Sequence, residues 1–148
     1  MASDNRRHAR RRKWEANLDL LRKFVRENGT LPRTSGTDRE PFERAIGGWL
    51  KNQRDPRAKH DARQRVQLEA LSVFAPRETR WDKRVEDYRG FWSNNRRDPL
   101  KSSQEPFESS LARWLELQRK AHRSLKLQYR RSAELSDINP DWERKPLT

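Results

Sequence analysis

An internal repeat constrains this chain more than any other feature of its sequence. The string Glu-Pro-Phe-Glu at positions 40–43 recurs at positions 105–108. Further pairs at almost the same separation are Trp14 with Trp81, Trp49 with Trp114, and Gln53-Arg54 with Gln118-Arg119. Matches that keep the same order along the chain indicate tandem units rather than chance. We predict two repeats, at residues 14–80 and 81–145, behind a basic arm at 1–13.

Within each repeat the apolar residues recur at the spacing of a helix. One stripe runs from Trp14 to Val25, returning at every third or fourth residue, and Asn28-Gly29 is typical of its end. The other helices are expected around Phe42–Leu50, from the capping pattern at Asp61 to Phe74, from Thr79, around Phe107–Leu115, and from Ser124 to Leu135. No segment alternates like a strand, so the sequence predicts an all-α protein of two three-helix bundles.

The core of each bundle must be thin, because only 31% of the residues are hydrophobic and 39% are charged. Six tryptophans offset this shortage, since each buried Trp removes about 150–250 Å² from water. Five of them lie on apolar stripes or at repeat ends, and we assign these to the core: Trp14, Trp49, Trp81, Trp114 and Trp142. For Trp92, beside Phe91, stacking on an unpaired base stays open. In the helix from Asp61, either Val66, Ala70 and Val73 or Leu68 and Leu71 face inward.

The net charge of +13, from 35 basic and 22 acidic side chains, favours a polyanionic partner, with nucleic acid as the first candidate. The alternative is that the charge only keeps a thin-cored protein soluble. The arm has no apolar stripe and is expected to be disordered when free. Its arginines are Arg6, Arg7, Arg10, Arg11 and Arg12. Such an arm reaches into a minor groove, folds on RNA, or serves only as a solubilising or localisation tail.

Several classes of protein are excluded or disfavoured by residue types. Cysteine is absent and the three histidines are scattered, so no metal site, disulfide or cofactor is expected. No apolar run is long enough to span a membrane, and no secretory signal is present, so we expect a cytoplasmic, nucleoid-associated protein. Import into an organelle is a minor alternative, because the start is rich in arginine. The paired glutamates at 40 and 43 suit a helix start, and we expect no enzyme and no small-molecule substrate.

Basic residues gather between the second and third helices of each repeat. We assign them to a nucleic-acid interface: Lys51, Arg54, Arg57, Lys59, Arg63, Arg119, Lys120, Arg123, Lys126 and Arg130. Two helices joined by a short basic turn have helix-turn-helix geometry, in which the second helix enters the major groove and the junction contacts phosphates. The alternative is an ordinary solvated helix face.

The Gln-Arg pairs at 53–54 and 118–119 allow two interpretations. Gln pairs with adenine and Arg with guanine, so the pairs are suited to reading bases. Alternatively, Arg54 and Arg119 bridge to acids of their own repeat, such as Glu43 or Glu108. Both remain open at this point.

A family resemblance rests on an ordered set of residues. Ile-Gly-Gly-Trp-Leu at 46–50 is followed by Gln53-Arg54, a basic loop, an L-x-x-L pair at 68–71, and Trp81. This order resembles the helicase-associated domain family, as does the second repeat, in which Ala112 replaces the family's glycine. The resemblance implies a small Myb-like module, commonly appended to bacterial or phage helicase-like proteins and thought to bind nucleic acid. The phosphate-binding loop of a helicase motor is missing.

The sequence therefore predicts a non-catalytic binding protein, most favourably for double-stranded DNA. RNA binding within a ribonucleoprotein is the first alternative, because net charge does not distinguish the two polymers. The second is a helical adaptor that docks on a protein partner, such as a replication, recombination or host factor.

Overall fold

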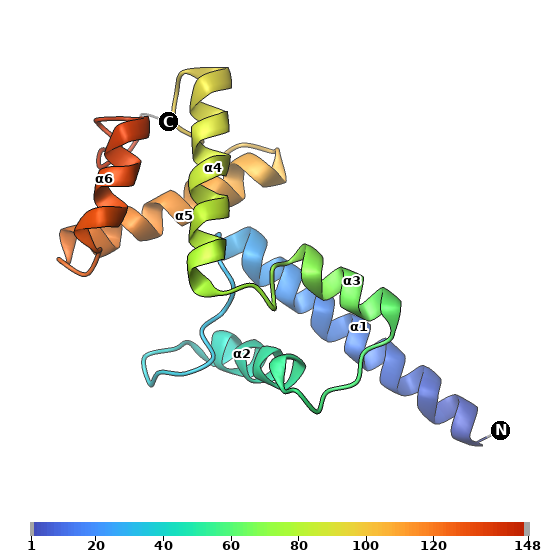
Figure 1. The fold of residues 1–148 in the computed structure, drawn as a ribbon. Helices are drawn as coiled ribbons and strands as arrows, with labels where there is room; N and C mark the ends of the chain where they lie inside the picture. The colour runs from blue at the N-terminus through green and yellow to red at the C-terminus, as the bar shows by residue number, and fades with distance from the viewer. Residues whose placement is uncertain (1, 147–148) are drawn as a thin grey trace. The chain divides into compact units, whose positions relative to one another are not determined.

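The computed structural model describes residues 2–146, which form helices and connecting loops without any strand (Figure 1). The helices are α1 (Ala2–Asn28), α2 (Pro41–Arg54), α3 (Ala62–Ala70), α4 (Arg77–Asn95), α5 (Pro106–Arg123) and α6 (Tyr129–Ile138). The all-α prediction is confirmed. In the part of the chain that the structure describes, no helix is both long and apolar enough to cross a membrane.

The chain divides into two compact units. The first comprises the described residues up to Val25 together with Leu31–Phe74, and the second comprises Arg26–Thr30 together with the described residues from Ala75 onward. In the first unit α1, α2 and α3 enclose one apolar core. Its buried side chains are Leu18, Leu21, Phe24, Ile46, Leu50, Leu68 and Val73.

The ends of α1 and α3 follow local chain chemistry. Gly29 after α1 has φ of +79°, which is the left-handed end that the sequence predicted. At the start of α3, the Asp61 carboxylate accepts from the Gln64 amide at 2.7 Å, and the Gln64 side chain accepts from the Asp61 amide at 3.0 Å. This capping box was predicted. The same helix ends earlier than Phe74, because Ser72 turns left-handed and directs Val73 into the core.

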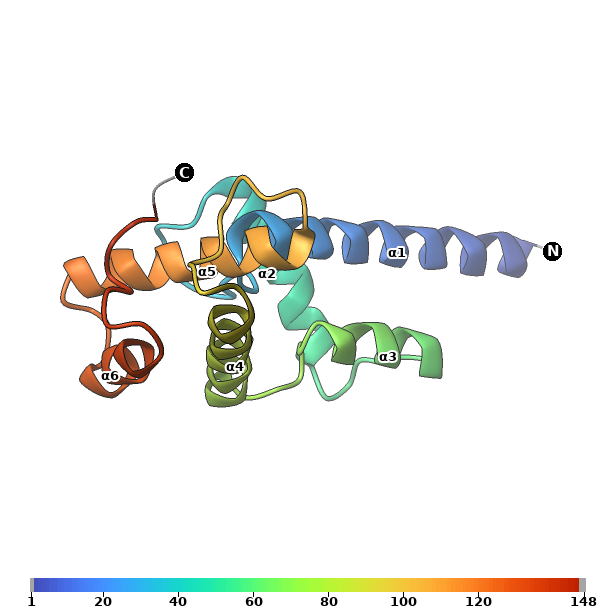
Figure 2. The ribbon, with the colours of Figure 1, turned by 90° about the horizontal axis from the view of Figure 1, so that it is seen from above.

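In the second unit α4, α5 and α6 enclose the other core. Figure 2 looks nearly along α4, with α5 running across it. The buried apolar side chains are Trp81, Val85, Tyr88, Leu111, Trp114, Leu115, Leu135, Ile138 and Trp142. Val85, Tyr88, Leu111, Leu115 and Leu135 are the counterparts of Leu18, Leu21, Ile46, Leu50 and Leu68 in the first core.

Two predicted helix starts in the second unit were wrong. The first helix begins at Arg77 rather than Thr79, because it starts directly after Pro76, whose fixed φ of −59° suits a helix entry. The third begins at Tyr129 rather than Ser124, because α5 continues to Arg123 and the chain then turns at Leu125, which has φ of +57°. A left-handed leucine gives no sequence signal comparable to glycine.

The predicted disorder of the arm was also wrong. Residues 2–13 continue α1 without a break (Figure 2), although the side chains of 3–13 are exposed. The packed residues after Trp14 supply the costly first turn, so each further residue only has to extend an existing helix. No glycine or proline interrupts residues 2–28, and Arg, Lys and Ala are favourable in helices. An apolar stripe is needed to bury a helix, but not to extend one.

Adjacent glycines in α2 provide a matched pair of substitutions. A Cβ on Gly47 would collide with the carbonyl oxygen of Arg33, whereas a Cβ on Gly48 would meet nothing within 4 Å. We expect Gly47→Ala to lower the free energy of unfolding of the first unit by about 1–3 kcal/mol. We expect Gly48→Ala to raise it by about 0.5–1 kcal/mol. Urea unfolding of both variants tests this, and equal effects of the two would contradict the close approach at Gly47.

Candidate nucleic-acid interface

Basic residues surround the connection between α2 and α3 in the first unit. Lys51 lies in the last turn of α2, Lys59 in the loop, and Arg63 in the first turn of α3; all three are exposed. None of them forms an ion pair with another described residue. Arg57 is exposed as well, but its guanidinium pairs with Asp55 at 3.0 Å. Three unpaired cations therefore remain at this connection.

The second unit repeats this arrangement between α5 and α6. Lys120 and Arg123 lie in the last turn of α5 and Lys126 in the following loop, and all three are exposed. Within residues 2–146, these three have no ion-pair partner either. Arg130 in the first turn of α6 differs, because its guanidinium lies 2.7 Å from Glu78. We call the six unpaired residues the junction cations: Lys51, Lys59, Arg63, Lys120, Arg123 and Lys126.

Two exposed apolar side chains beside the second junction were missed by the sequence analysis. Leu125 is 94% exposed and Tyr129 is 86% exposed. Both lie outside the apolar stripe of their unit and within a run of basic residues, which was the available signal. In the second unit, exposed cations, an exposed leucine and an exposed aromatic ring therefore follow one another closely along the chain.

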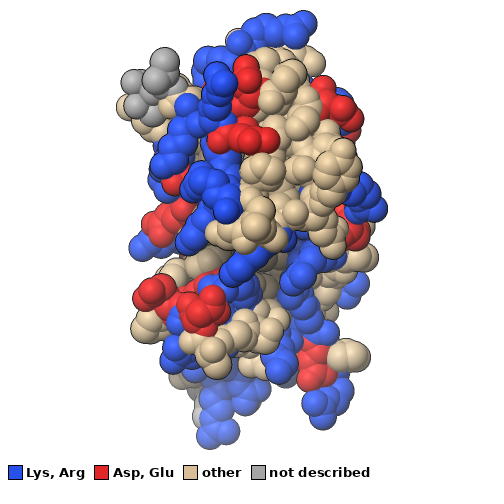
Figure 3. Space-filling model, turned by 90° about the vertical axis from the view of Figure 1, so that its left-hand side faces the viewer, with Lys and Arg blue, Asp and Glu red and all other residues tan. Residues whose placement is uncertain are grey.

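On the face drawn in Figure 3, Lys and Arg side chains cover far more of the surface than Asp and Glu side chains. Several of the acids on α1 and α4 are held by neighbouring cations on the same helix. Asp19 pairs with Arg22 at 3.0 Å, and Glu86 pairs with Arg89 at 3.2 Å. The charge of these two acids is therefore compensated on their own helices.

Arg119 lies inside the second unit, which corrects its assignment to the interface. Only 3% of its side chain is exposed, and its Nη2 lies 3.1 Å from Asp98 Oδ2. Its Nε donates to the carbonyl oxygen of Trp142 at 2.8 Å. Asp98 also accepts from the hydroxyl of Tyr88 at 2.6 Å and from the amide of Asn139 at 3.2 Å. Arg119 thus joins α5 to the chain segments before it and after α6.

Arg54 has the equivalent structural place in the first unit. It is half-buried, and its Nε donates to the carbonyl oxygen of Val73 at 2.8 Å. The bridging alternative is therefore the one that the structure favours, and we leave Arg54 and Arg119 out of the interface. The partners differ from those expected, since Glu43 pairs with Arg33 and Glu108 pairs with Arg97.

The tryptophans lie in or against the two cores. Trp81 and Trp114 are each 4% exposed, and Trp142 is fully buried. Trp14 and Trp49 are half-buried against each other, with ring centroids 5.8 Å apart. Trp92 is half-buried and packs on the second core. The five assigned tryptophans therefore occupy the core region, although Trp14 keeps part of its ring accessible.

The arginines of the predicted arm lie on the N-terminal part of α1. All five are exposed, and none of them pairs with a described acid: Arg6, Arg7, Arg10, Arg11 and Arg12. Their helical placement fixes the direction of the backbone, so they form a cationic extension of α1 instead of a flexible tail.

His60 couples the first junction to pH. Its Nε2 lies 2.9 Å from Gln53 Oε1, and burial lowers the pKa of its imidazole. Protonation therefore favours the unfolded chain, in which the pKa is near 6.5. The stability that His60 contributes above pH 6.5 is lost as the pH falls through the lower folded-state pKa. We expect the urea midpoint of the first unit to fall between pH 7.5 and 5.5, and His60→Asn to abolish most of that fall.

The fold and its exposed junctions define a small all-helical module, present twice in tandem. Residues 11–75 match the family profile of the Helicase associated domain, so this part of the chain is similar to that family. The match confirms the resemblance in the first repeat; the second repeat lies outside the matched range. No curated protein and no solved structure matched the chain. In the described part, no three His, Cys, Asp or Glu side chains are grouped so as to hold a metal ion.

Proposed function

We propose that the chain is a non-catalytic binder of double-stranded DNA. The observation that carries this proposal is that three exposed, unpaired cations recur at the same connection in both units. An exposed cation without a counter-charge is available to an external anion, and the closely spaced phosphates of a duplex supply such anions. The similarity of residues 11–75 to the Helicase associated domain also supports a function on nucleic acid.

Each unit would use its second and third helices in the manner of a helix-turn-helix. The junction cations would contact phosphates, and the exposed face of α3 or α6 would lie toward the major groove. Leu125 and Tyr129 would add apolar contacts with sugars or bases in the second unit. Asp19 on α1 and Glu86 on α4 would lie away from the duplex, because a carboxylate repels phosphates.

The two units would act together. Once one unit is bound, the tether raises the effective concentration of the other, so the pair binds more tightly than either unit alone. The arginines on the extension of α1 would contact further phosphates. Binding of this kind would place the protein with the nucleoid.

Competition between polymers tests the proposal. Fluorescence anisotropy of labelled duplex DNA, with unlabelled duplex and hairpin RNA as competitors, should show that duplex DNA competes better. A variant with the five arm arginines changed to glutamine should bind more weakly and keep the same preference. Preference for hairpin RNA would assign the chain to RNA. Failure to bind either polymer near physiological salt would favour a protein partner instead.

A further inference from the structure

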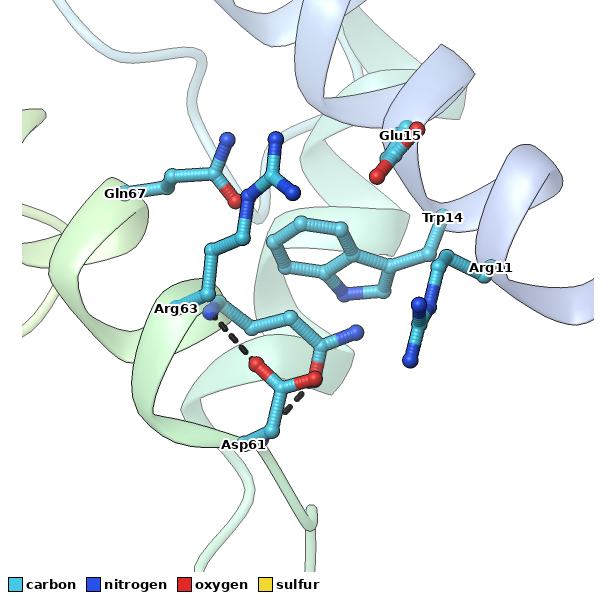
Figure 4. Close-up of a pocket in the computed structure, with 7 residues that line it drawn as sticks. Arg11, Trp14, Glu15, Asp61, Arg63 and Gln67 are labelled. Atoms are coloured by element: carbon cyan, nitrogen blue, oxygen red, sulfur yellow. Dashed lines mark hydrogen bonds between the residues drawn. The ribbon is translucent and has the colours of Figure 1, made fainter.

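A pocket lies between α1 and α3 within the first unit. Its volume is about 260 Å³, and its lining includes Arg11, Trp14 and Glu15 from α1 and Arg63 and Gln67 from α3. Figure 4 shows the indole of Trp14 projecting from α1 toward α3, with Arg11 on one side of it and Arg63 and Gln67 on the other. Asp61 also borders the pocket, but its carboxylate is engaged as the cap of α3.

The same place in the second unit is closed. Trp81 corresponds to Trp14, yet it is only 4% exposed, because the guanidinium of Arg131 lies 4.5 Å from its ring centroid. Glu78 holds this guanidinium in place at 2.7 Å. The second unit therefore contains a lid over Trp81, made of Glu78 on α4 and Arg131 on α6.

The first unit lacks this lid. The third helices start after Asp61 and Gln128, and Leu68 and Leu135 are their fully buried leucines. In this register, with Trp14 opposite Trp81, arginine stands at position 11 in place of Glu78, and glutamine stands at position 64 in place of Arg131. Arginine and glutamine cannot form an ion pair, so part of the Trp14 ring stays accessible. Arg63 adds a second cation at the rim, and neither arginine pairs with an acid among the described residues.

We propose that this pocket holds one unpaired nucleotide, with the base stacked on Trp14 and the phosphate bound by Arg11 and Arg63. An accessible indole face suits any planar base, and two unpaired guanidinium groups suit a phosphate. Glu15 would accept a hydrogen bond from an amino group of the base. The inference rests on the proposed function. It adds that the first unit binds a nucleotide that lies outside the paired duplex.

The test uses a duplex that carries a single bulged 2-aminopurine, whose fluorescence falls when it stacks. The full chain should quench this fluorescence and bind the bulged duplex about tenfold more tightly than the fully paired one. The double variant Arg11→Glu with Gln64→Arg places the glutamate and the arginine of the second unit's lid at the corresponding positions of the first unit. It should abolish both the quenching and the preference, while loss of the Gln64 side chain from the capping box should lower the melting temperature by only a few degrees.

Arg63→Gln is a second variant, because Arg63 is exposed and its loss should not affect folding; it should weaken the preference severalfold. Absence of quenching by the unchanged chain, or equal quenching by the lid variant, would overturn the pocket assignment. Paired-duplex binding would survive that result, whereas failure of the proposed function would remove binding to both duplexes. Titration with 2-aminopurine deoxynucleoside monophosphate distinguishes a strand from a free nucleotide. Binding of the monophosphate as tightly as the bulged duplex would support the pocket and assign it to free nucleotides.

Discussion

Arg119→Ala is expected to lower the free energy of unfolding of the second unit by about 3–5 kcal/mol. The substitution leaves the carboxylate of Asp98, whose side chain is 7% exposed, without its only cationic partner among the described residues. It also removes the donor to the carbonyl oxygen of Trp142, which anchors the segment after α6. A loss of this size is a large part of the total stability of a small domain, about 5–15 kcal/mol.

Urea unfolding followed by tryptophan fluorescence measures this effect. Arg123→Ala, one turn further along α5 and exposed, is the matched control and should change the free energy of unfolding by no more than about 0.5 kcal/mol. The loss of stability comes from a buried carboxylate that no longer has a cationic partner. The double change Asp98→Ala with Arg119→Ala should therefore lower the free energy of unfolding by less than the sum of the two single changes. A loss below about 1 kcal/mol for Arg119→Ala would contradict the buried pair.

Replacing all six junction cations by glutamine is expected to weaken duplex DNA binding at physiological salt by about 10³-fold. Each cation bound to a phosphate releases condensed counterions, which favours binding. Each substitution removes one such contribution, so the losses of binding free energy add up. The side chains are exposed and unpaired, so the fold should be unaffected. Anisotropy titration of a labelled duplex at one salt concentration measures the change.

The control removes the same number of positive charges elsewhere. It replaces six exposed residues outside the junctions by glutamine: Lys23, Arg26, Arg44, Lys83, Arg89 and Arg96. If the junctions form the interface, the fold-loss of affinity in the control variant should be less than about a tenth of the fold-loss in the junction variant. Equal losses in both variants would mean that net charge alone attracts DNA and that no surface is favoured.

The fold was predictable because its determinants are periodic and repeated. The stripe from Trp14 to Val25 and its recurrence from Trp81 predict α1 and α4 without any knowledge of packing. Helix ends were predicted where a side chain makes them, as at Asp61. They were missed where a non-glycine residue such as Leu125 turns left-handed, because the surrounding contacts impose that conformation.

The candidate site was predictable only as a region. Arg119 and Arg123 are one helical turn apart and have the same charge, yet one is buried against Asp98 and the other is exposed. What separates them is the path of the chain after α6, which brings the carbonyl oxygen of Trp142 to Arg119. Likewise, the pocket at Trp14 depends on which side chains of α1 and α3 face each other, and this is set by tertiary packing. Charge clustering indicates where an anion binds, but tertiary packing decides which cations remain available.

The salt dependence of duplex DNA binding tests the central claim most directly. With six junction cations and one or two arginines of the α1 extension engaged, log K should fall against log salt with a slope of about −6 to −7. Removing the junction cations should bring the slope to about −1 or −2. A shallow slope for the unchanged chain, or a steep slope that the junction variant keeps, would show that these connections do not bind the phosphates.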